Sequence, residues 1–196
     1  MTINFVTTNP GKVKAMTEHL AGLAIEVRQV SLDLIEPQAD TVEEVALSKA
    51  RQAFKQLKRP VVVEDSAFCI DELHGFPGPY IKYVLETVGI DGILQLASRL
   101  KSRRCHFVSA LAYIDARGIP EIFVERGKDG QLATVSAREN TEEAWSELWR
   151  IFIPHGAKNP LSALTQEERE AVWDSWRKQS KFVEFGQWHK RQESAG

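Results

Sequence analysis

The feature that most constrains the fold is a run of three valines at 61–63, which directly follows a proline. A short, wholly apolar run of β-branched residues is typical of a strand that is buried on both faces of a sheet. Glu64 and Asp65 come immediately after it. Open α/β sheets bind ligands at the carboxyl ends of buried strands, so two carboxylates stand where a ligand is expected.

Adjacent carboxylates repel each other unless a cation lies nearby. Two interpretations of Glu64 and Asp65 follow. In the first, the pair belongs to a solvated turn in which Ser66 caps the next segment. In the second, the two carboxylates hold Mg²⁺, which commonly binds one or two carboxylates together with substrate phosphates.

A stiff loop at 75–79 favours the second interpretation. Its sequence, GFPGP, is unsuited to either a helix or a strand, and Lys82 follows it closely. The loop therefore brings a basic side chain to the same rim as the carboxylates. We expect Lys82 to contact a phosphate of the ligand.

A second candidate site lies near the amino terminus, where a short apolar strand at 3–6 ends in a polar turn. Asn9 is a favoured helix N-cap, and Pro10 is a favoured first helical residue. The amides at this helix start, with the side chains of Thr7, Asn9 and Lys12, predict an anion site. The alternative is an ordinary capped helix. There is no Walker-type glycine loop, so a P-loop is not expected.

The composition excludes several classes of protein. Hydrophobic residues make up 43% and charged residues 27% of the 196 residues, which is ordinary for a globular protein. The formal net charge of −2 argues against a broad nucleic-acid or membrane-surface contact and favours a small anionic ligand. No stretch approaches the roughly 18 apolar residues of a membrane span, and two cysteines are too few for a disulfide scaffold. We expect a cytoplasmic protein.

The rest of the pattern predicts an α/β fold with a mixed twisted sheet and flanking helices. Turns are expected at 89–92, 115–118 and 127–130, and the polar tail 186–196 is expected to fray. Strands are expected at 3–6, 25–30, 61–63, 107–114, 119–125 and 131–136, and helices at 10–20, 42–57, 81–87, 93–100 and 165–179.

Covalent catalysis is not expected. The five histidines show no metal-ligand spacing, no serine lies in a GxSxG elbow, and neither Cys69 nor Cys105 has a clear activating partner.

Four ordered motifs resemble those of the inosine triphosphate pyrophosphatase family: FVTTNPGK, LSKA, VVVEDS and GFPGPYIKYVLE. The likeness runs from Thr2 to about Ser136. It implies a single domain over 1–196, with two lobes around a nucleotide cleft, that is usually a homodimer. It also implies hydrolysis of a noncanonical purine triphosphate to the monophosphate and pyrophosphate with Mg²⁺ as the cofactor, or Mn²⁺ in its place.

The resemblance also implies roles for individual residues. Glu36 matches a metal-binding glutamate of the family, with Glu44 as the alternative because the loop lengths differ by a residue. The matching residues are Thr7, Asn9, Lys12 and Lys49 for the triphosphate, Glu36, Glu64 and Asp65 for the metal, and Asp65 and Lys82 for catalysis.

The carboxyl-terminal part departs from the family pattern at both segments that grip the purine in the family. Trp149, Arg169 and Asp174 stand there instead as candidate base contacts, and they predict altered base specificity. The alternative is that the tryptophans fill a rearranged lobe. A pyrophosphatase is favoured over a nucleotide-binding protein without catalysis, because Asp65 and Lys82 are both present and a pure binder has little need of a base.

Overall fold

A computed structural model describes residues 2–178 and 180–194. It contains two compact units. The first comprises the described residues within Met1–Asp65, Ser109–Glu125 and Arg177–Gly196, and the second comprises Ser66–Val108 and Arg126–Trp176. Three strands contribute residues to both units: β3 (Val61–Ile70), β5 (Arg104–Ile114) and β6 (Pro120–Leu132).

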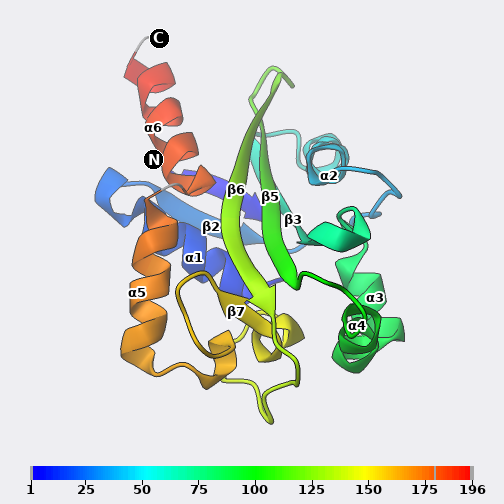
Figure 1. Cartoon of the computed structure of the whole chain (residues 1–196). Helices are drawn as coiled ribbons and strands as arrows, with labels where there is room; N and C mark the ends of the chain where they lie inside the picture. Colours follow the sequence, from blue (N-terminus) through cyan, green and yellow to red (C-terminus); the bar gives the residue numbers. More distant parts are fainter. Residues whose placement is uncertain (1, 179, 195–196) are drawn as a thin grey trace. The chain divides into compact units, whose positions relative to one another are not determined.

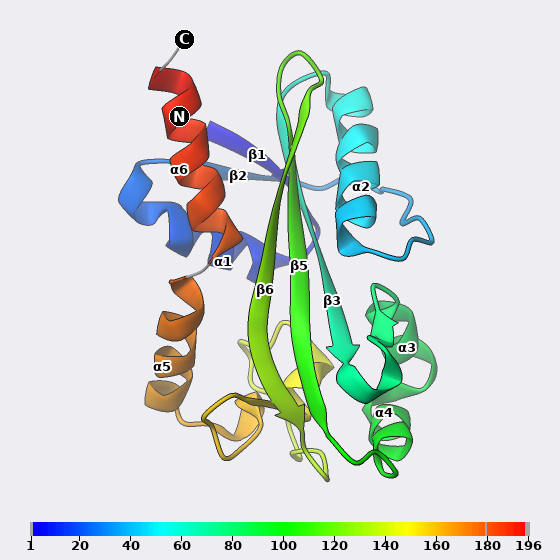
Figure 2. The same cartoon turned by 45° about the horizontal axis from the view of Figure 1, so that its top comes forward.

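The first unit is built on a mixed sheet with the strand order β2-β1-β3-β5-β6. β1 (Thr2–Val6) pairs in parallel with both β2 (Glu26–Val30) and β3. The helices of this unit are α1 (Pro10–Leu20), the 3₁₀ turn η1 (Ala21–Leu23), α2 (Val42–Leu57) and α6 (Lys181–Ser194). Figures 1 and 2 show α2 and α6 on opposite sides of β5, so helices flank this part of the sheet on both faces.

The core of the first unit lies between the sheet and the helix pair α1 and α6. Phe5 of β1, Met16 of α1 and Phe185 of α6 are fully buried in it. α1 begins at a side-chain cap, because Asn9 Oδ1 accepts from the amides of Gly11 and Lys12 at 2.9 and 3.3 Å. Apolar residues one helical turn apart then bring α1 onto the core.

The second unit has its own aromatic core. The Phe107 ring lies 5.0 Å from that of Phe68 and 4.9 Å from that of Phe152, measured between centroids. Its strand order is β3-β5-β6-β7, with β4 paired to β3. The further elements are η2 (Asp71–Leu73), β4 (Pro77–Gly78), α3 (Ile81–Thr87), α4 (Gly89–Ala97), η3 (Glu147–Arg150), β7 (Phe152–Pro154), η4 (Leu161–Ala163) and α5 (Gln166–Arg177).

The hairpin turn predicted at 115–118 is confirmed in the first unit. Asp115 Oδ1 accepts from the amides of Arg117 and Ile119 at 2.9 and 2.8 Å. Desolvation acts to raise the pKa of the Asp115 carboxyl, but these bonds and the Arg117 guanidinium hold the pKa below its ordinary value. Thr41 caps α2 in a similar way, because its hydroxyl accepts from the amide of Glu44 at 3.3 Å.

The prediction that the central strand ends at Glu64 and Asp65 is wrong. β3 continues to Ile70, so both carboxylates lie within the strand and are buried, and Ser66 starts no helix. The loop at 75–79 was also expected to be free of strand. Instead Pro77 and Gly78 form β4, and they pair antiparallel with Cys69 and Phe68 of β3.

Two predicted turns and the predicted carboxyl-terminal tail also differ from the structure. α4 begins at Gly89, so 89–92 is helical rather than a turn between helices. β6 runs through 127–130 to Leu132, and no separate strand starts at 131. Residues 186–194 of the expected tail belong to α6, because Phe182 and Phe185 bury its apolar face, whereas 195–196 lie outside the described residues.

Gly130 allows the close approach of β6 to β7 in the second unit. It pairs with Pro154, and a Cβ at this position would overlap the Ile153 carbonyl oxygen and the Phe152 ring. A backbone oxygen cannot swing aside as a side-chain end can, so the strands would have to separate.

We therefore expect Gly130→Ala to lower the free energy of unfolding by about 1–3 kcal/mol, in the range measured for overpacking. Gly22→Ala is the matched control, because a Cβ there meets nothing within 4 Å. Denaturant unfolding of both variants checks this. Equal stability of the two would contradict the assigned β6–β7 contact.

Candidate active site

Lys49 joins two of the predicted carboxylates in the first unit. Its Nζ on α2 lies 3.0 Å from Glu36 Oε2 and 3.0 Å from Asp65 Oδ1. The Asp65 side chain is 8% exposed and that of Lys49 is 17% exposed, so the pair is largely withdrawn from water. The structure thus brings together Glu36, Lys49 and Asp65, as the sequence predicted. Glu44 only caps α2.

Burial and charge act in opposite directions on these two groups. Burial raises the pKa of Asp65 above its ordinary value, although Lys49 and Lys12 oppose the rise. Burial alone would lower the pKa of Lys49, but the negative charges of Asp65 and Glu36 outweigh it and raise that pKa. Lys49 therefore stays a cation, and Asp65 is a better proton acceptor than an exposed aspartate.

Glu64 meets two other lysines. Lys12 Nζ of α1 lies 2.6 Å from its Oε2, and Lys181 Nζ of α6 lies 3.2 Å from its Oε1. Successive residues of a strand point to opposite faces. This alternation explains why Asp65 meets a lysine from α2, whereas Glu64 meets lysines from α1 and α6.

The amino-terminal turn is a closed cap in this structure. Thr7 Oγ1 accepts from the Asn9 amide at 3.1 Å, and the Asn9 side chain accepts from the first amides of α1. The geometry is that of the alternative interpretation, the ordinary capped helix. Lys12 extends from this turn to Glu64, where its Nζ also donates to the Glu64 carbonyl at 3.3 Å.

The carboxylates suit a hard divalent cation by their chemistry. Glu36 and Asp65 approach one nitrogen, Lys49 Nζ, from two sides, so they flank a single cationic position. Oxygen donors of this kind are the ligands that Mg²⁺ prefers. Within residues 2–178 and 180–194, no three His, Cys, Asp or Glu side chains are grouped closely enough to hold a metal by themselves. Glu36 and Asp65 would be the protein ligands, and Lys49 would have to move aside.

Lys82 belongs to the second unit, where it is exposed on α3. Its contact with phosphate stays a prediction. Asp174 is exposed on α5, and the Arg169 guanidinium donates to the Leu164 carbonyl and has its Nε 3.9 Å from Glu143. A role for Arg169 and Asp174 at a base also stays a prediction.

Trp149 requires a correction. It is 2% exposed in the core of the second unit, and its ring lies 5.4 Å from that of Trp173 and 6.0 Å from that of Trp145. A ring covered in this way has no face for a base. Trp149 is therefore a core residue, as in the alternative interpretation in which the tryptophans fill a rearranged lobe.

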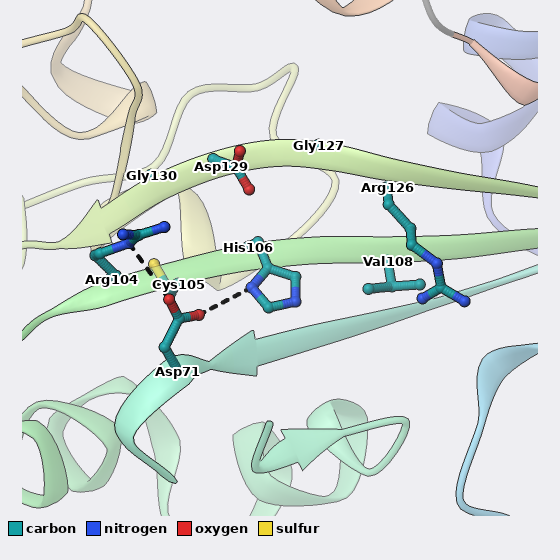
Figure 3. A pocket seen from close by; sticks show the side chains of 9 residues that line it. All are labelled: Asp71, Arg104, Cys105, His106, Val108, Arg126, Gly127, Asp129 and Gly130. Atoms are coloured by element: carbon teal, nitrogen blue, oxygen red, sulfur yellow. Dashed lines mark hydrogen bonds and ion pairs between the residues drawn. The ribbon is translucent and has the colours of Figure 1, made fainter. Parts of the chain in front are cut away.

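The second unit also holds a polar cavity of about 540 Å³ along β5 and β6. Figure 3 shows Asp71 reaching from the end of β3 toward Arg104 and His106 on β5. One carboxylate oxygen of Asp71 lies 3.0 Å from His106 Nδ1, and the other lies 3.4 Å from Arg104 Nε. Asp71 is therefore already balanced by its neighbours.

The two cysteines are poor nucleophiles. Burial raises the pKa of both thiols, strongly so for Cys105, and the charge of Asp71 adds to the rise. A thiol with a raised pKa remains protonated near neutral pH.

Sequence reasoning missed Lys181 and its second carboxylate, Glu125 of β6, whose Oε2 lies 3.5 Å from the ammonium. The sequence does contain a pattern that predicts the helix carrying Lys181. Phe182, Phe185 and Trp188 recur every three residues, which indicates a helix that buries one face.

Among the described residues no helix is both long and apolar enough to cross a membrane.

Comparison with known proteins finds relatives along most of the chain. Residues 3–184 match the model of the Ham1 family. A dITP/XTP pyrophosphatase from Methanopyrus kandleri is 36% identical over 185 residues, which cover 94% of this chain and 96% of that protein. An inosine triphosphate pyrophosphatase from Pyricularia oryzae is 37% identical over 131 residues, covering 67% of this chain and 68% of that protein.

Solved structures share the fold. The crystal structure of a nucleoside-triphosphatase, a dITP/XTP pyrophosphatase from Mycobacterium abscessus, gives a TM-score of 0.71 at 26% identity and covers 90% of this chain and 96% of that one. A HAM1 protein from Coxiella burnetii gives 0.78 at 21% identity, with 97% and 99% covered, a likeness of fold alone. The expected mixed α/β class is confirmed.

Proposed function

The chain belongs to the Ham1 family, and from that premise we propose that it hydrolyses a nucleoside triphosphate to the nucleoside monophosphate and pyrophosphate. The observation that carries the proposal is the position of Asp65. It is a buried carboxylate with a raised pKa that shares Lys49 with Glu36. Such a group is suited to take a proton at a site that binds an anion.

Different residues carry out proton transfer and charge stabilisation. Asp65 accepts the proton of the attacking water as its oxygen bonds to phosphorus, and pyrophosphate leaves with the electron pair of the broken phosphoanhydride bond. Lys12, Lys49 and Lys82 supply positive charge to the phosphate oxygens as negative charge builds up on them.

We propose Mg²⁺, with Mn²⁺ as a substitute, as the cofactor held by Glu36 and Asp65. When bound, the ion shields phosphate charge and makes water more acidic. The phosphates of a bound triphosphate would offer Lys49 new anionic partners, so Lys49 could leave the two carboxylates without losing charge compensation. Glu64 has both oxygens on lysines, which favours a supporting role over direct ligation.

Asp65→Asn should reduce turnover at least about 100-fold, because the amide cannot accept the proton. The change keeps the shape of the side chain, so the variant should unfold at nearly the same denaturant concentration as the wild type. Asp33→Asn, an exposed aspartate in the loop before α2, is the matched control and should retain full activity. Product analysis after incubation with triphosphate and Mg²⁺ checks the reaction.

Two outcomes would count against this proposal. Release of orthophosphate in place of pyrophosphate would contradict the site of attack. Tight triphosphate binding by calorimetry, with no product after long incubation with Mg²⁺ or Mn²⁺, would instead favour a nucleotide-binding protein without catalysis.

We propose that base specificity is relaxed, so that inosine and xanthosine triphosphates are not strongly preferred over other nucleoside triphosphates. The proposal is supported by Trp149, whose ring is covered, and by Arg169, whose guanidinium already donates to a backbone carbonyl. Discrimination of about 10⁴-fold requires buried polar groups that a wrong base leaves unpaired.

Rates for inosine, xanthosine, guanosine, adenosine, uridine and thymidine triphosphates, measured side by side, should therefore differ by less than about tenfold among the purines. A roughly hundredfold preference for the inosine form would show that the pocket still reads that edge.

We also propose a homodimer, on the basis of the family resemblance, and a cytoplasmic location, on the basis of the two free cysteines. Light scattering at micromolar protein should give twice the monomer mass of 22.1 kDa. The monomer mass would rule out the dimer at that concentration.

A further inference from the structure

Lys181 is a lysine that water barely reaches. Its side chain is 2% exposed, and its Nζ donates to Ser109 Oγ at 2.8 Å. The same nitrogen lies 3.2 Å from Glu64 Oε1 and 3.5 Å from Glu125 Oε2. Burying an ammonium group is costly unless charges and hydrogen bonds surround it. Here they do, so the position of Lys181 is tightly specified.

The contacts form a line of alternating charges that leads outward. Lys181 contacts one oxygen of Glu64, and Lys12 contacts the other oxygen at 2.6 Å. The exposed fraction rises along this line, from 2% for Lys181 and 4% for Glu64 to 27% for Lys12. A solute can reach Lys12, whereas Lys181 can influence it only through Glu64.

The backbone strengthens this arrangement. The amide of Lys181 donates to Glu125 Oε2 at 3.2 Å, so the first residue of α6 is attached to β6 by its main chain as well as its side chain. Glu64 on β3 is thereby held from α6, and its second oxygen has a defined direction toward Lys12. Without Lys181, two buried carboxylates would remain with one fewer positive charge between them.

We propose that Lys181 is a positioning residue for triphosphate binding and hydrolysis. It fixes the Glu64 carboxylate, which in turn holds the Lys12 ammonium where the phosphates bind. This rests on the proposed function, because it assumes that Lys12 meets the triphosphate. Lys181 itself touches no substrate.

Lys181→Met removes the charge and keeps the stem. It should raise KM for inosine triphosphate about tenfold and lower kcat as well, a size typical of coupling between contacting residues. Lys181→Arg should recover part of the loss, because it restores the charge. Lys14→Met is the matched control, since Lys14 lies on α1 with an exposed partner, Glu18, at 4.0 Å. Its kinetics should equal those of the wild type.

A double-mutant cycle separates positioning from mere stability. If Lys181 acts through Glu64 and Lys12, then Lys181→Met should add less than about a twofold effect in a Lys12→Met background. A merely structural role would lower the melting temperature and the active fraction, leave KM unchanged, and give additive effects. Those results would overturn the proposal.

Ser109→Ala covers the case in which Lys181→Met does not fold. It removes one hydrogen bond of the ammonium and leaves all charges in place, so KM should rise about two- to fivefold. An unchanged KM in folded Ser109→Ala, together with unchanged KM in Lys181→Arg, would count against positioning.

Calorimetric titration of each variant with inosine triphosphate, without added metal, makes the two proposals separable. In a separate assay with Mg²⁺, a wild type that yields no pyrophosphate would sink the proposed function. The affinities would still decide the role of Lys181: weaker binding by about tenfold in Lys181→Met supports it, and equal binding overturns it.

Discussion

Two adjacent buried carboxylates on β3 are the constraint to which the first unit is fitted. An ionised carboxylate withdrawn from water is strongly disfavoured unless cations and hydrogen-bond donors surround it. Asp65 and Glu64 point to opposite faces of the strand, so one helix cannot neutralise both. α2 supplies Lys49 on one side, and α1 and α6 supply Lys12 and Lys181 on the other.

The burial that destabilises the charged form of Asp65 also raises its pKa and so makes it a better base. Because burial disfavours the ionised carboxylate, Asp65 accepts a proton more readily than an aspartate in water does. The lysines that stabilise these carboxylates are the same groups that an incoming triphosphate would attract. Ligand phosphates and protein carboxylates therefore compete for one set of cations, which lets a site of opposite charges remain stable before the substrate arrives.

Local signals in the sequence predicted much of this structure. Asn9, Thr41 and Asp115 each bond to amides two to four residues away, so capping and turn chemistry was readable from short segments. The resemblance assigned Glu36, Lys49 and Asp65 to one site, and the structure brings these three side chains together. Charged residues misled the strand assignment, because β3 continues through Glu64 and Asp65 only when lysines from distant segments cover them. Gly130 misled it for another reason: glycine is common in turns, but here it admits a neighbouring strand.

Long-range pairing also has a consequence in time. A ribosome adds Glu64 after Lys12 but well before Lys181, so the newly made β3 has only one of the two lysines that contact this carboxylate. Full burial of Glu64 therefore waits until α6 can dock, since an earlier collapse would leave the Glu64 oxygen that faces Lys181 without its cation. Contacts between segments so far apart form slowly, because the intervening chain must first be ordered. The first unit is thus completed late, with α6 closing it over charges laid down near the start of synthesis.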